Sequence, residues 1–524
     1  MALRFVFVLM STLLLAAPGT SFHPGKPTHA MVSAVIATEM PEATGTTSGA
    51  ATASGAESAI SPASASGGYV LIPMDDGQRN HLKAYGLIYG HLADGHTGKW
   101  LLNYRGGSFM APETSSLVRN SRLRGVSTEI ISAARARQII HQVEQPNVNM
   151  SVVELEKAPR IAVYAPDHYL PWDDAVTLAL TYAEVPYDVI YNEEVLAGEL
   201  DNYDWLHLHH EDFTGQHGKF WFAYRNHPWY IRQVRDLEEM ADRLGFQKVS
   251  EMKRAVVLTI RDYIRNGGFL FAMCSGADTF DIALAAKNVD ILPTPFDGDP
   301  ADPDANEKLD FSQTLAFDNF EVTLDPAEYR HGNIDILDVQ QRMQQVDEEM
   351  DYFTLFNFSA KWDPVPTMLT QNHVSSIKGF YGQTTAFRLE TIKSNVVILA
   401  QAPGRNEAKY IYGNYGEGFF TFYGGHDPED YKHHVGDPPT ELDLFPNSPG
   451  YRLILNNILF PAAQKQELQT HHPDTCPHHR DYFSVAPDAS VAPGFFADSQ
   501  MRSISSREVS RMFFPSPFST SSIN

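Results

Sequence analysis

The sequence of 524 residues contains only two cysteines, Cys274 and Cys476. So few cysteines exclude a disulfide-stapled scaffold and a cysteine-rich zinc site. Basic residues are also scarce, with 40 Lys and Arg against 64 Asp and Glu, which gives a formal net charge of −24. Because such a surface repels phosphate backbones and anionic lipid headgroups, we expect no nucleic-acid partner. The hydrophobic content of 43% is still ample for a large core.

Long hydrophobic runs are missing from the body of the sequence, and one of intermediate length lies at the amino terminus. Arg4 precedes an apolar run over residues 5–17, and small residues follow up to Phe22. This pattern predicts a signal peptide over residues 1–22, and therefore an exported, periplasmic or extracellular protein. An uncleaved anchor is the alternative, but the run is shorter than the roughly 20 residues that a membrane span needs. We expect no span in the mature chain.

Composition divides the remainder of the chain. Residues 23–68 are rich in Ala, Ser, Thr and Gly, which predicts a disordered linker, and residues 464–524 form a polar tail that we expect to be largely disordered. The ordered body is expected to hold an N-terminal α/β unit over residues 69–150. A larger α/β domain follows over residues 158–463, with an insertion at about residues 297–391.

Short apolar runs alternate with amphipathic segments throughout this body, which predicts an α/β fold with a mostly parallel sheet. In the N-terminal unit the predicted strands are 69–73, 100–104 and 128–131, and the predicted helices are 78–92 and 115–124. In the larger domain the predicted strands are 160–164, 187–191, 204–208, 268–273, 395–400 and 418–423, and the predicted helices include 173–183, 230–244, 251–265 and 278–286.

One of the two cysteines lies at a turn from a predicted strand to a predicted helix. It is Cys274, followed by Ser275 and Gly276. A nucleophile at such an elbow is exposed at the carboxyl edge of the sheet, where helix amides stabilise a thiolate and an oxyanion. His426 and Glu429 follow the last predicted strand, and we expect them at the same edge. A buried cysteine without chemistry is the alternative.

This combination resembles the class I glutamine amidotransferase-like superfamily, whose motifs are Gly-x-Cys-x-Gly and a late His-Pro-Glu. The resemblance covers roughly residues 160–461 and implies a flavodoxin-like, mostly parallel sheet. It also implies that Cys274 is the nucleophile, His426 the base and Glu429 the orienting acid of an amide hydrolase or amidotransferase. Ala272 replaces the first glycine of the elbow motif. The late segment is also similar to the trehalose-utilisation-type branch of this superfamily, many of whose members are not amidotransferases.

A second resemblance extends over nearly all of residues 69–463. It is to a family of exported Bacteroidetes-type proteins that carry the label asparagine synthetase B, and it rests on the segments Leu71–Met74, Trp100–Ser108, Trp205–Gly215 and Asn447–Arg452. Glutamine-dependent asparagine synthetases use an amino-terminal cysteine, whereas the first cysteine of this chain is Cys274. They also need a Ser-Gly-Gly-x-Asp-Ser loop, and the Ser-Gly-Gly at residues 66–68 lacks its Asp and Ser.

Five candidate metal ligands occur within six residues: His207, His209, His210, Glu211 and Asp212. On a strand His207 and His209 share one face, and the set is typical of zinc or another divalent ion. We expect this segment to lie beside the elbow, where the two carboxylates would oppose an oxyanion unless a cation compensates them. Hydrogen-bonded histidines at a sheet edge are the alternative.

Three functions therefore stay open at the level of sequence. The first is an exported cysteine-dependent amide hydrolase or amidotransferase. The second is a non-catalytic envelope or binding protein on the same fold, and the third is a metal-dependent hydrolase centred on residues 207–212. No cofactor is indicated beyond a divalent metal, and the small-molecule or amide substrate is not specified by the sequence.

Overall fold

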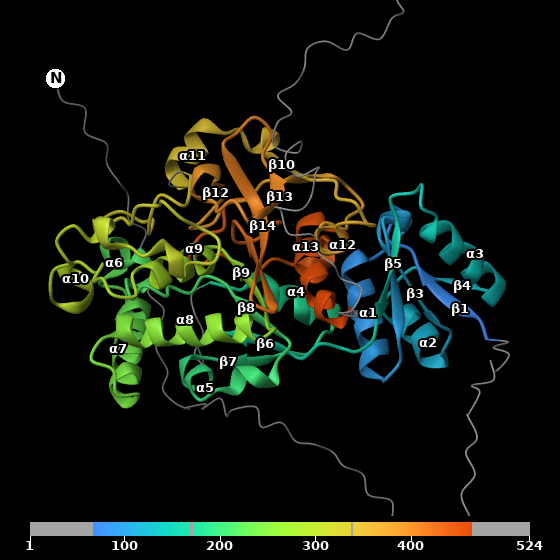
Figure 1. The fold of residues 1–524 in the computed structure, drawn as a ribbon, viewed down its shortest axis with the longest axis horizontal. Coiled ribbons are helices and arrows are strands. Elements are labelled where there is room, and N and C mark those ends of the chain that lie inside the picture. Colours follow the sequence, from blue (N-terminus) through green and yellow to red (C-terminus); the bar gives the residue numbers. More distant parts are fainter. Residues whose placement is uncertain (1–66, 167–171, 337–338, 464–524) are drawn as a thin grey trace, which may run out of the picture. The chain divides into compact units, whose positions relative to one another are not determined.

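Two β-sheets, one of five strands and one of ten, organise the chain in the computed structural model (Figure 1). The structure describes residues 67–166, 172–336 and 339–463. The predicted signal peptide, nearly all of the predicted linker and the predicted tail lie outside these ranges. The mixture of helices and strands confirms an α/β fold. Within the described ranges, no helix has both the length and the apolar character that a membrane crossing requires.

The first sheet is antiparallel throughout, with the strand order β4-β1-β3-β2-β5. The prediction of parallel pairing is therefore wrong for this part of the chain. The reason is the turn at Gly106 and Gly107, whose φ angles of 74° and 89° send the chain straight back from β2 into β3. Its elements are β1 (Tyr69–Ile72), α1 (His81–Ala93), β2 (Gly98–Leu102), β3 (Ser108–Pro112), α2 (Ser115–Leu123), β4 (Glu129–Ile131), α3 (Ala133–Glu144) and β5 (Ser151–Leu155).

Half of the second sheet is parallel, as predicted for the larger domain. Its five parallel strands lie in the order β7-β6-β8-β9-β15. They are β6 (Ile161–Tyr164), β7 (Asp188–Ile190), β8 (Trp205–Leu208), β9 (Phe269–Met273) and β15 (Gly418–Tyr423). The helices among and after them are α4 (Ala175–Ala183), α5 (Asn192–Leu196), α6 (Trp221–Tyr224), α7 (Pro228–Arg243), α8 (Val249–Arg265), α9 (Ser275–Ala285), α10 (Thr294–Asp297) and α13 (Pro449–Leu459).

The other half of this sheet is antiparallel and continues from β15 in the order β14-β13-β10-β11. The strand predicted near residues 418–423 closes the parallel half as β15, but the strand predicted near residues 395–400 does not join it, because β13 pairs antiparallel with β14. A tight turn at Gly416 and Glu417 folds β14 back onto β15. The elements are α11 (Val339–Gln345), β10 (Tyr352–Leu355), α12 (Pro364–Leu369), β11 (Ser376–Lys378), β12 (Phe387–Arg388), β13 (Val397–Gln401) and β14 (Glu407–Tyr415).

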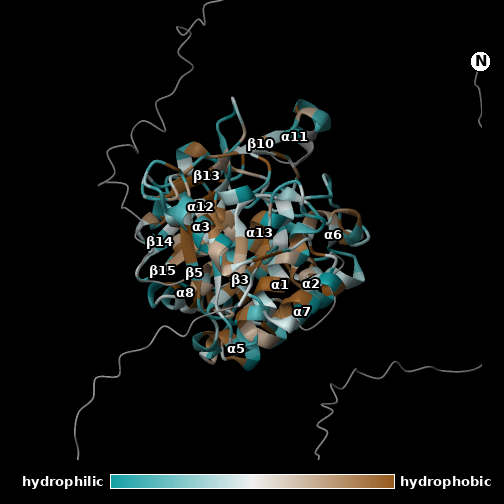
Figure 2. Cartoon of the chain, turned by 90° about the vertical axis from the view of Figure 1, so that its right-hand side faces the viewer, coloured by the Kyte–Doolittle hydropathy of each residue, from teal (hydrophilic) through white to brown (hydrophobic). Residues whose placement is uncertain are grey.

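Both faces of the central parallel strands β6, β8 and β9 are buried, which explains why these strands are almost entirely apolar. Alternate side chains of one strand, such as Ile161 and Val163, join a core that includes α1, α4 and α13. Their neighbours Ala162 and Tyr164 join a second core with α5, α8 and α9. In Figure 2 hydrophobic residues gather on α1, α13 and β5, whereas α11 is largely hydrophilic.

A fully buried arginine connects α13 to the first sheet. Arg452 donates from Nη1 to the carbonyl oxygen of Met74 at 3.0 Å and from Nη2 to the carbonyl oxygen of Gly106. Its Nε donates to the hydroxyl of Tyr85 at 3.2 Å. Every nitrogen of the buried guanidinium therefore has a hydrogen-bond partner, as a buried polar group requires.

Candidate metal centre

The carboxyl ends of the parallel strands bring several polar loops together. The chain runs from β6 to β7 on one side and then crosses to β8 on the other, so β6 and β8 flank the point at which the strand order reverses. In open α/β sheets, ligands bind at this point, outside the carboxyl ends of the strands. Asp173 and Asp174 follow β6, His209 and His210 follow β8, and His426 follows β15.

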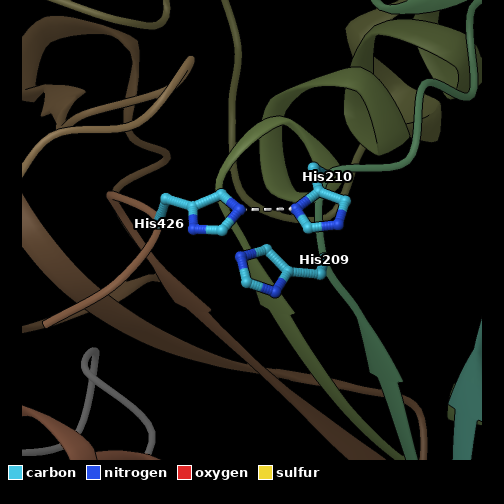
Figure 3. Close-up of side chains that lie close together, drawn as sticks. All are labelled: His209, His210 and His426. Carbon is cyan, nitrogen blue, oxygen red and sulfur yellow. Dashed lines mark hydrogen bonds between the residues drawn. The ribbon is translucent and has the colours of Figure 1, made fainter. Parts of the chain in front are cut away.

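Three histidines from two of these loops point toward one another (Figure 3). The Nδ1 atom of His210 lies 2.8 Å from the Nε2 atom of His426. The ring of His209 lies against both, with centroid distances of 4.2 Å to His210 and 4.4 Å to His426. One nitrogen from each ring falls within 4.8 Å of the other two. We call these three residues the histidine triad.

Two imidazoles of the triad, those of His210 and His426, are held in their neutral form. Burial lowers the pKa of His210 and of His426 well below the usual value of 6.5, and the neighbouring imidazoles lower both further. Neither ring nitrogen of His209 makes a hydrogen bond, and neither does Nδ1 of His426, although all three atoms are buried. Neutral imidazoles with unpartnered nitrogens are the form in which histidine binds metals.

The spacing of the triad fits a tetrahedral ion. Zinc binds imidazole nitrogens at about 2.0–2.1 Å, which places two ligand nitrogens of a tetrahedral site about 3.3 Å apart. The nitrogens of His210 and His426 are already at 2.8 Å, and those of all three residues lie within 4.8 Å of one another. The three nitrogens are therefore grouped on the scale of a single coordination sphere.

Asp174 braces the triad from the side of β6. Its Oδ2 atom lies 3.2 Å from Nδ1 of His209 and 3.2 Å from Nε2 of His207. Burial opposes ionisation, but the two imidazoles hold the pKa of Asp174 well below its usual range. His207 is fully buried, and its Nδ1 atom lies 3.2 Å from the carbonyl oxygen of Phe271. His207 therefore faces Asp174 and not the rings of His210 and His426.

A charged histidine stacks on the triad. The ring of His433 lies parallel to that of His426, with 4.1 Å between centroids. Its Nε2 atom lies 3.1 Å from Asp173 and its Nδ1 atom 3.1 Å from Asp430. Burial lowers the pKa of His433, but the hydrogen bonds of these two carboxylates outweigh it and raise the pKa to about 10. Both ring nitrogens of His433 therefore face carboxylates, which favours its charged form.

Cys274 occupies the predicted elbow between β9 and α9. Its backbone has φ 52° and ψ −139°, a conformation that a non-glycine residue rarely adopts. Because β9 and β15 are parallel neighbours, Cys274 and His426 follow strands that end at the same edge of the sheet. The thiol is 2% exposed, and burial raises its pKa, against the backbone amides of Thr384, Ser275 and Gln383, which lower it.

The structure does not join Cys274 to an acid–base partner among the described residues. His426 directs Nε2 toward His210, and it makes no hydrogen bond to the thiol. Glu429 interacts with Ser448, and burial raises the pKa of its carboxyl group. The cause is the extra residue Asp427, whose Oδ1 atom accepts from the amide of Glu429 at 2.9 Å and forms a local turn. The Cys274, His426 and Glu429 arrangement that the resemblance implies is therefore not assembled in this structure.

The two other elbow residues are packed rather than open. Ser275 is fully buried, and its hydroxyl has no hydrogen-bond partner. Gly276 lies so close to β8 that a Cβ atom built on it would meet the carbonyl oxygen of His209 at 2.0 Å. The first turn of α9 is thus packed directly against the loop that carries His209 and His210.

The carboxylates of Glu211 and Asp212 are engaged elsewhere, so the expectation that they confront an oxyanion at the elbow is wrong. Glu211 forms a buried ion pair with Lys253 at 3.1 Å. Asp212 accepts hydrogen bonds from Thr214 and from the amide of Gly218. These partners turn both carboxylates into structural groups, and neither belongs to a metal-binding cluster in the described part of the chain.

The sequence interpretation missed three residues of this region. Asp174 begins α4 as its N-cap, and a pair of acidic residues before an apolar helix is the sequence signal that indicates such a cap. Asp173 and His433 meet across the sheet edge, and no local pattern announces that contact.

Comparisons with known proteins add little to this geometry. No protein-family model and no curated protein match the chain. Two solved structures, the cytoplasmic proteins STM3548 from Salmonella typhimurium and STM1381 from Salmonella typhimurium LT2, each show 13% identity over 58% of this chain and 100% of their own, with TM-scores of 0.29 and 0.30. A third, Gan42B, a GH42 beta-galactosidase, shows 10% identity over 52% of this chain and 28% of its own, with a TM-score of 0.23. Likeness at this level does not bear on function.

Proposed function

We propose that the chain is a metal-dependent hydrolase whose divalent ion, most simply zinc, is held by the histidine triad. The single observation that carries the proposal is the convergence of three histidine rings at the carboxyl edge of the parallel strands, His209 and His426 buried and His210 half-buried. Three histidine ligands that leave one coordination position open are typical of catalytic zinc sites. An ion there supplies Lewis acidity and activates water near neutral pH.

The residues around the ion would have two further roles, in excluding water and in stabilising negative charge. His209, His210 and His426 would hold the ion in a region that excludes bulk water, because His209 and His426 are 2% and 6% exposed. The imidazolium of His433, fixed by Asp173 and Asp430, places a positive charge one ring away. Such a fixed charge favours the negative charge that develops on a carbonyl oxygen during hydrolysis.

For the scaffold we propose a flavodoxin-like, class I glutamine amidotransferase-like domain. The order of the five parallel strands supports it, since in chain order it reads 2-1-3-4-5. We also propose that the protein is exported, on the sequence pattern of residues 1–22.

A cysteine-dependent amide hydrolase or amidotransferase is the second candidate. The strained elbow favours it, because three backbone amides face the thiol of Cys274. The raised pKa of this thiol and the interaction of Glu429 with Ser448 favour the metal-dependent reaction instead.

The test combines metal analysis with hydrolysis of a simple chromogenic ester, p-nitrophenyl acetate. We expect the purified protein to retain about one zinc per chain, as a three-histidine site implies, and to lose ester hydrolysis on chelation and regain it on adding zinc. His426→Ala should lose both properties. His141→Ala removes an exposed histidine of α3 and should keep both. If hydrolysis survives chelation and disappears in Cys274→Ala, the second candidate replaces the first.

A further inference from the structure

His209 belongs to two overlapping groups of potential metal ligands. Each of its two ring nitrogens can serve only one of these groups. With His210 and His426 it forms the triad, and with Asp174 and His207 it forms a second group of potential ligands, again with one atom from each within 4.8 Å of the others. Deciding between these clusters determines which residues bind the ion and which position the ligands.

The second cluster is saturated by its protein contacts. The Oδ1 atom of Asp174 accepts from the amides of Val176 and Thr177, both at 2.8 Å, at the start of α4. Its Oδ2 atom is shared by the two imidazoles of His207 and His209. The ring of His207 is fully buried and stacks against Trp205 and Phe271.

The carboxylate also selects the tautomer of His209. The Oδ2 atom of Asp174 lies 3.2 Å from Nδ1 of His209, although the angle departs from that of an ideal hydrogen bond. An ionised carboxylate can only accept hydrogen bonds. A lone pair on Nδ1 would face a negative oxygen, so the proton belongs on Nδ1. The lone pair then lies on Nε2, the nitrogen that points toward the other two rings in Figure 3.

We propose that Asp174 is a positioning residue of the metal centre: it fixes His209 with Nε2 toward the ion, while His207 packs behind it and is not a ligand. This inference rests on the proposed metal-binding function and adds the residue that orients one ligand. In metal sites a carboxylate that accepts from the distal nitrogen of a histidine holds both the tautomer and the ring orientation.

The decisive variant is Asp174→Asn. An asparagine can keep the hydrogen bonds to the backbone amides and reverse the direction of the hydrogen bond to His209. Its Oδ1 atom still accepts from the amides of Val176 and Thr177, which fixes the orientation of the side chain. Its NH2 group then takes the place of Oδ2 and donates to Nδ1 of His209. The variant therefore favours the tautomer of His209 with its proton on Nε2, which weakens the binding of an ion by this nitrogen.

The experiment compares zinc affinity by competition with a chelator, together with the visible absorption of bound Co²⁺, in wild type, Asp174→Asn and Asp204→Asn. The last is the matched control, since Asp204 also accepts from a backbone amide and pairs with a cation, but lies at the opposite end of β8. We expect the zinc affinity of Asp174→Asn to fall about 10- to 100-fold. The melting temperature of the metal-free protein and the affinity of Asp204→Asn should stay close to the wild-type values.

Two further variants place the ion independently of how Asp174→Asn folds. His207→Phe should keep zinc affinity within a few-fold of wild type, and His210→Ala should lose it. The reverse pattern would assign the ion to the second cluster and overturn the inference. Wild-type affinity in Asp174→Asn would also overturn it while leaving the metal centre in place. A wild-type protein that binds neither zinc nor Co²⁺ would overturn the inference and the proposed function together.

Discussion

His210 and His426 meet at 2.8 Å although 216 positions separate them in the chain. His210 follows β8 and His426 follows β15, and β9 lies between these two strands in the sheet. The meeting therefore depends on the pairing of β8, β9 and β15 in this order. A ligand that binds both residues favours the state in which these strands are paired.

Zinc should stabilise the wild-type protein and fail to stabilise the two triad variants His210→Ala and His426→Ala. A ligand that binds only the folded state at about 100 times its Kd adds about 2.7 kcal/mol to the free energy of unfolding. Thermal unfolding with and without zinc measures this gain. Equal gains in wild type and in both variants would place the ion elsewhere.

The thiol of Cys274 should react slowly with iodoacetamide at neutral pH. It is buried, and burial raises its pKa, so little thiolate is present. Peptide mapping by mass spectrometry separates its modification from that of Cys476. The reference is the same protein in denaturant, where the rate should rise strongly. Fast modification of the native thiol would favour the cysteine-dependent hydrolase over the metal-dependent one.

Asp335 should make the folded state less stable as the pH rises. Burial and the nearby charge of Asp278 raise the pKa of Asp335 from 3.8 to about 8, although backbone amides oppose the shift. A group with a raised pKa in the folded state contributes its stability fully below pH 3.8 and loses it as the pH approaches 8.

Asp335→Asn keeps the acceptor for the amides of Thr385 and Ala386 but cannot ionise. Its free energy of unfolding relative to wild type should therefore grow between pH 4 and pH 8, as measured by urea titration at several pH values. Asp76→Asn, which changes an exposed carboxylate, is the control. Parallel curves for wild type and Asp335→Asn would speak against the raised pKa.

Gly276→Ala should disturb the triad, because the added Cβ atom would lie 2.0 Å from the carbonyl oxygen of His209. Either α9 or the loop that carries His209 must move, and zinc affinity should fall together with stability. Gly90→Ala is the matched control in α1, where the nearest atom is 3.9 Å away and alanine favours the helix. Calorimetry and zinc titration follow both effects. Unchanged zinc binding in Gly276→Ala would show that the elbow and the triad are uncoupled.

Lys253→Met should destabilise the protein by about 3–5 kcal/mol, because it leaves the charge of Glu211 buried without its partner. Replacing both residues, as in Lys253→Met with Glu211→Leu, should recover much of the loss. Chemical denaturation of the two variants measures the difference. Equal losses in both would mean that packing rather than charge carries the effect.

The parallel half of the sheet was predictable because its strands are apolar on both faces. The run at residues 268–273 has this character and that at residues 204–208 has it except for Asp204 and His207, and the structure places β9 and β8 there. The antiparallel pairing of the first sheet was not predicted. Strands and helices alternate along this part of the chain too, and that alternation is the pattern of a parallel sheet. The decisive local signal was the pair Gly106 and Gly107, which indicates a chain reversal into β3.

The site was predictable in its residue types but not in its partnerships. Clustered histidines at a strand end indicated His209 and His210 as metal ligands, and the late motif indicated His426 as a functional residue. Sequence spacing gave no means of knowing that His426 faces His210 and not Cys274. That choice depends on the turn formed by Asp427, whose two carboxylate oxygens accept from the backbone and from Thr440 and Tyr451.

Arg452 makes the two sheets interdependent during unfolding. It belongs to α13, whereas the carbonyl groups of Met74 and Gly106 belong to the N-terminal part of the chain. Separation of the sheets would leave the guanidinium of Arg452 and the two carbonyl groups without hydrogen-bond partners in a partly apolar interface. Heating should therefore melt both sheets in one cooperative transition. A gene fragment that begins at residue 158 would expose the faces of α4 and α13 that now pack against α1, and aggregation is the expected fate of its product.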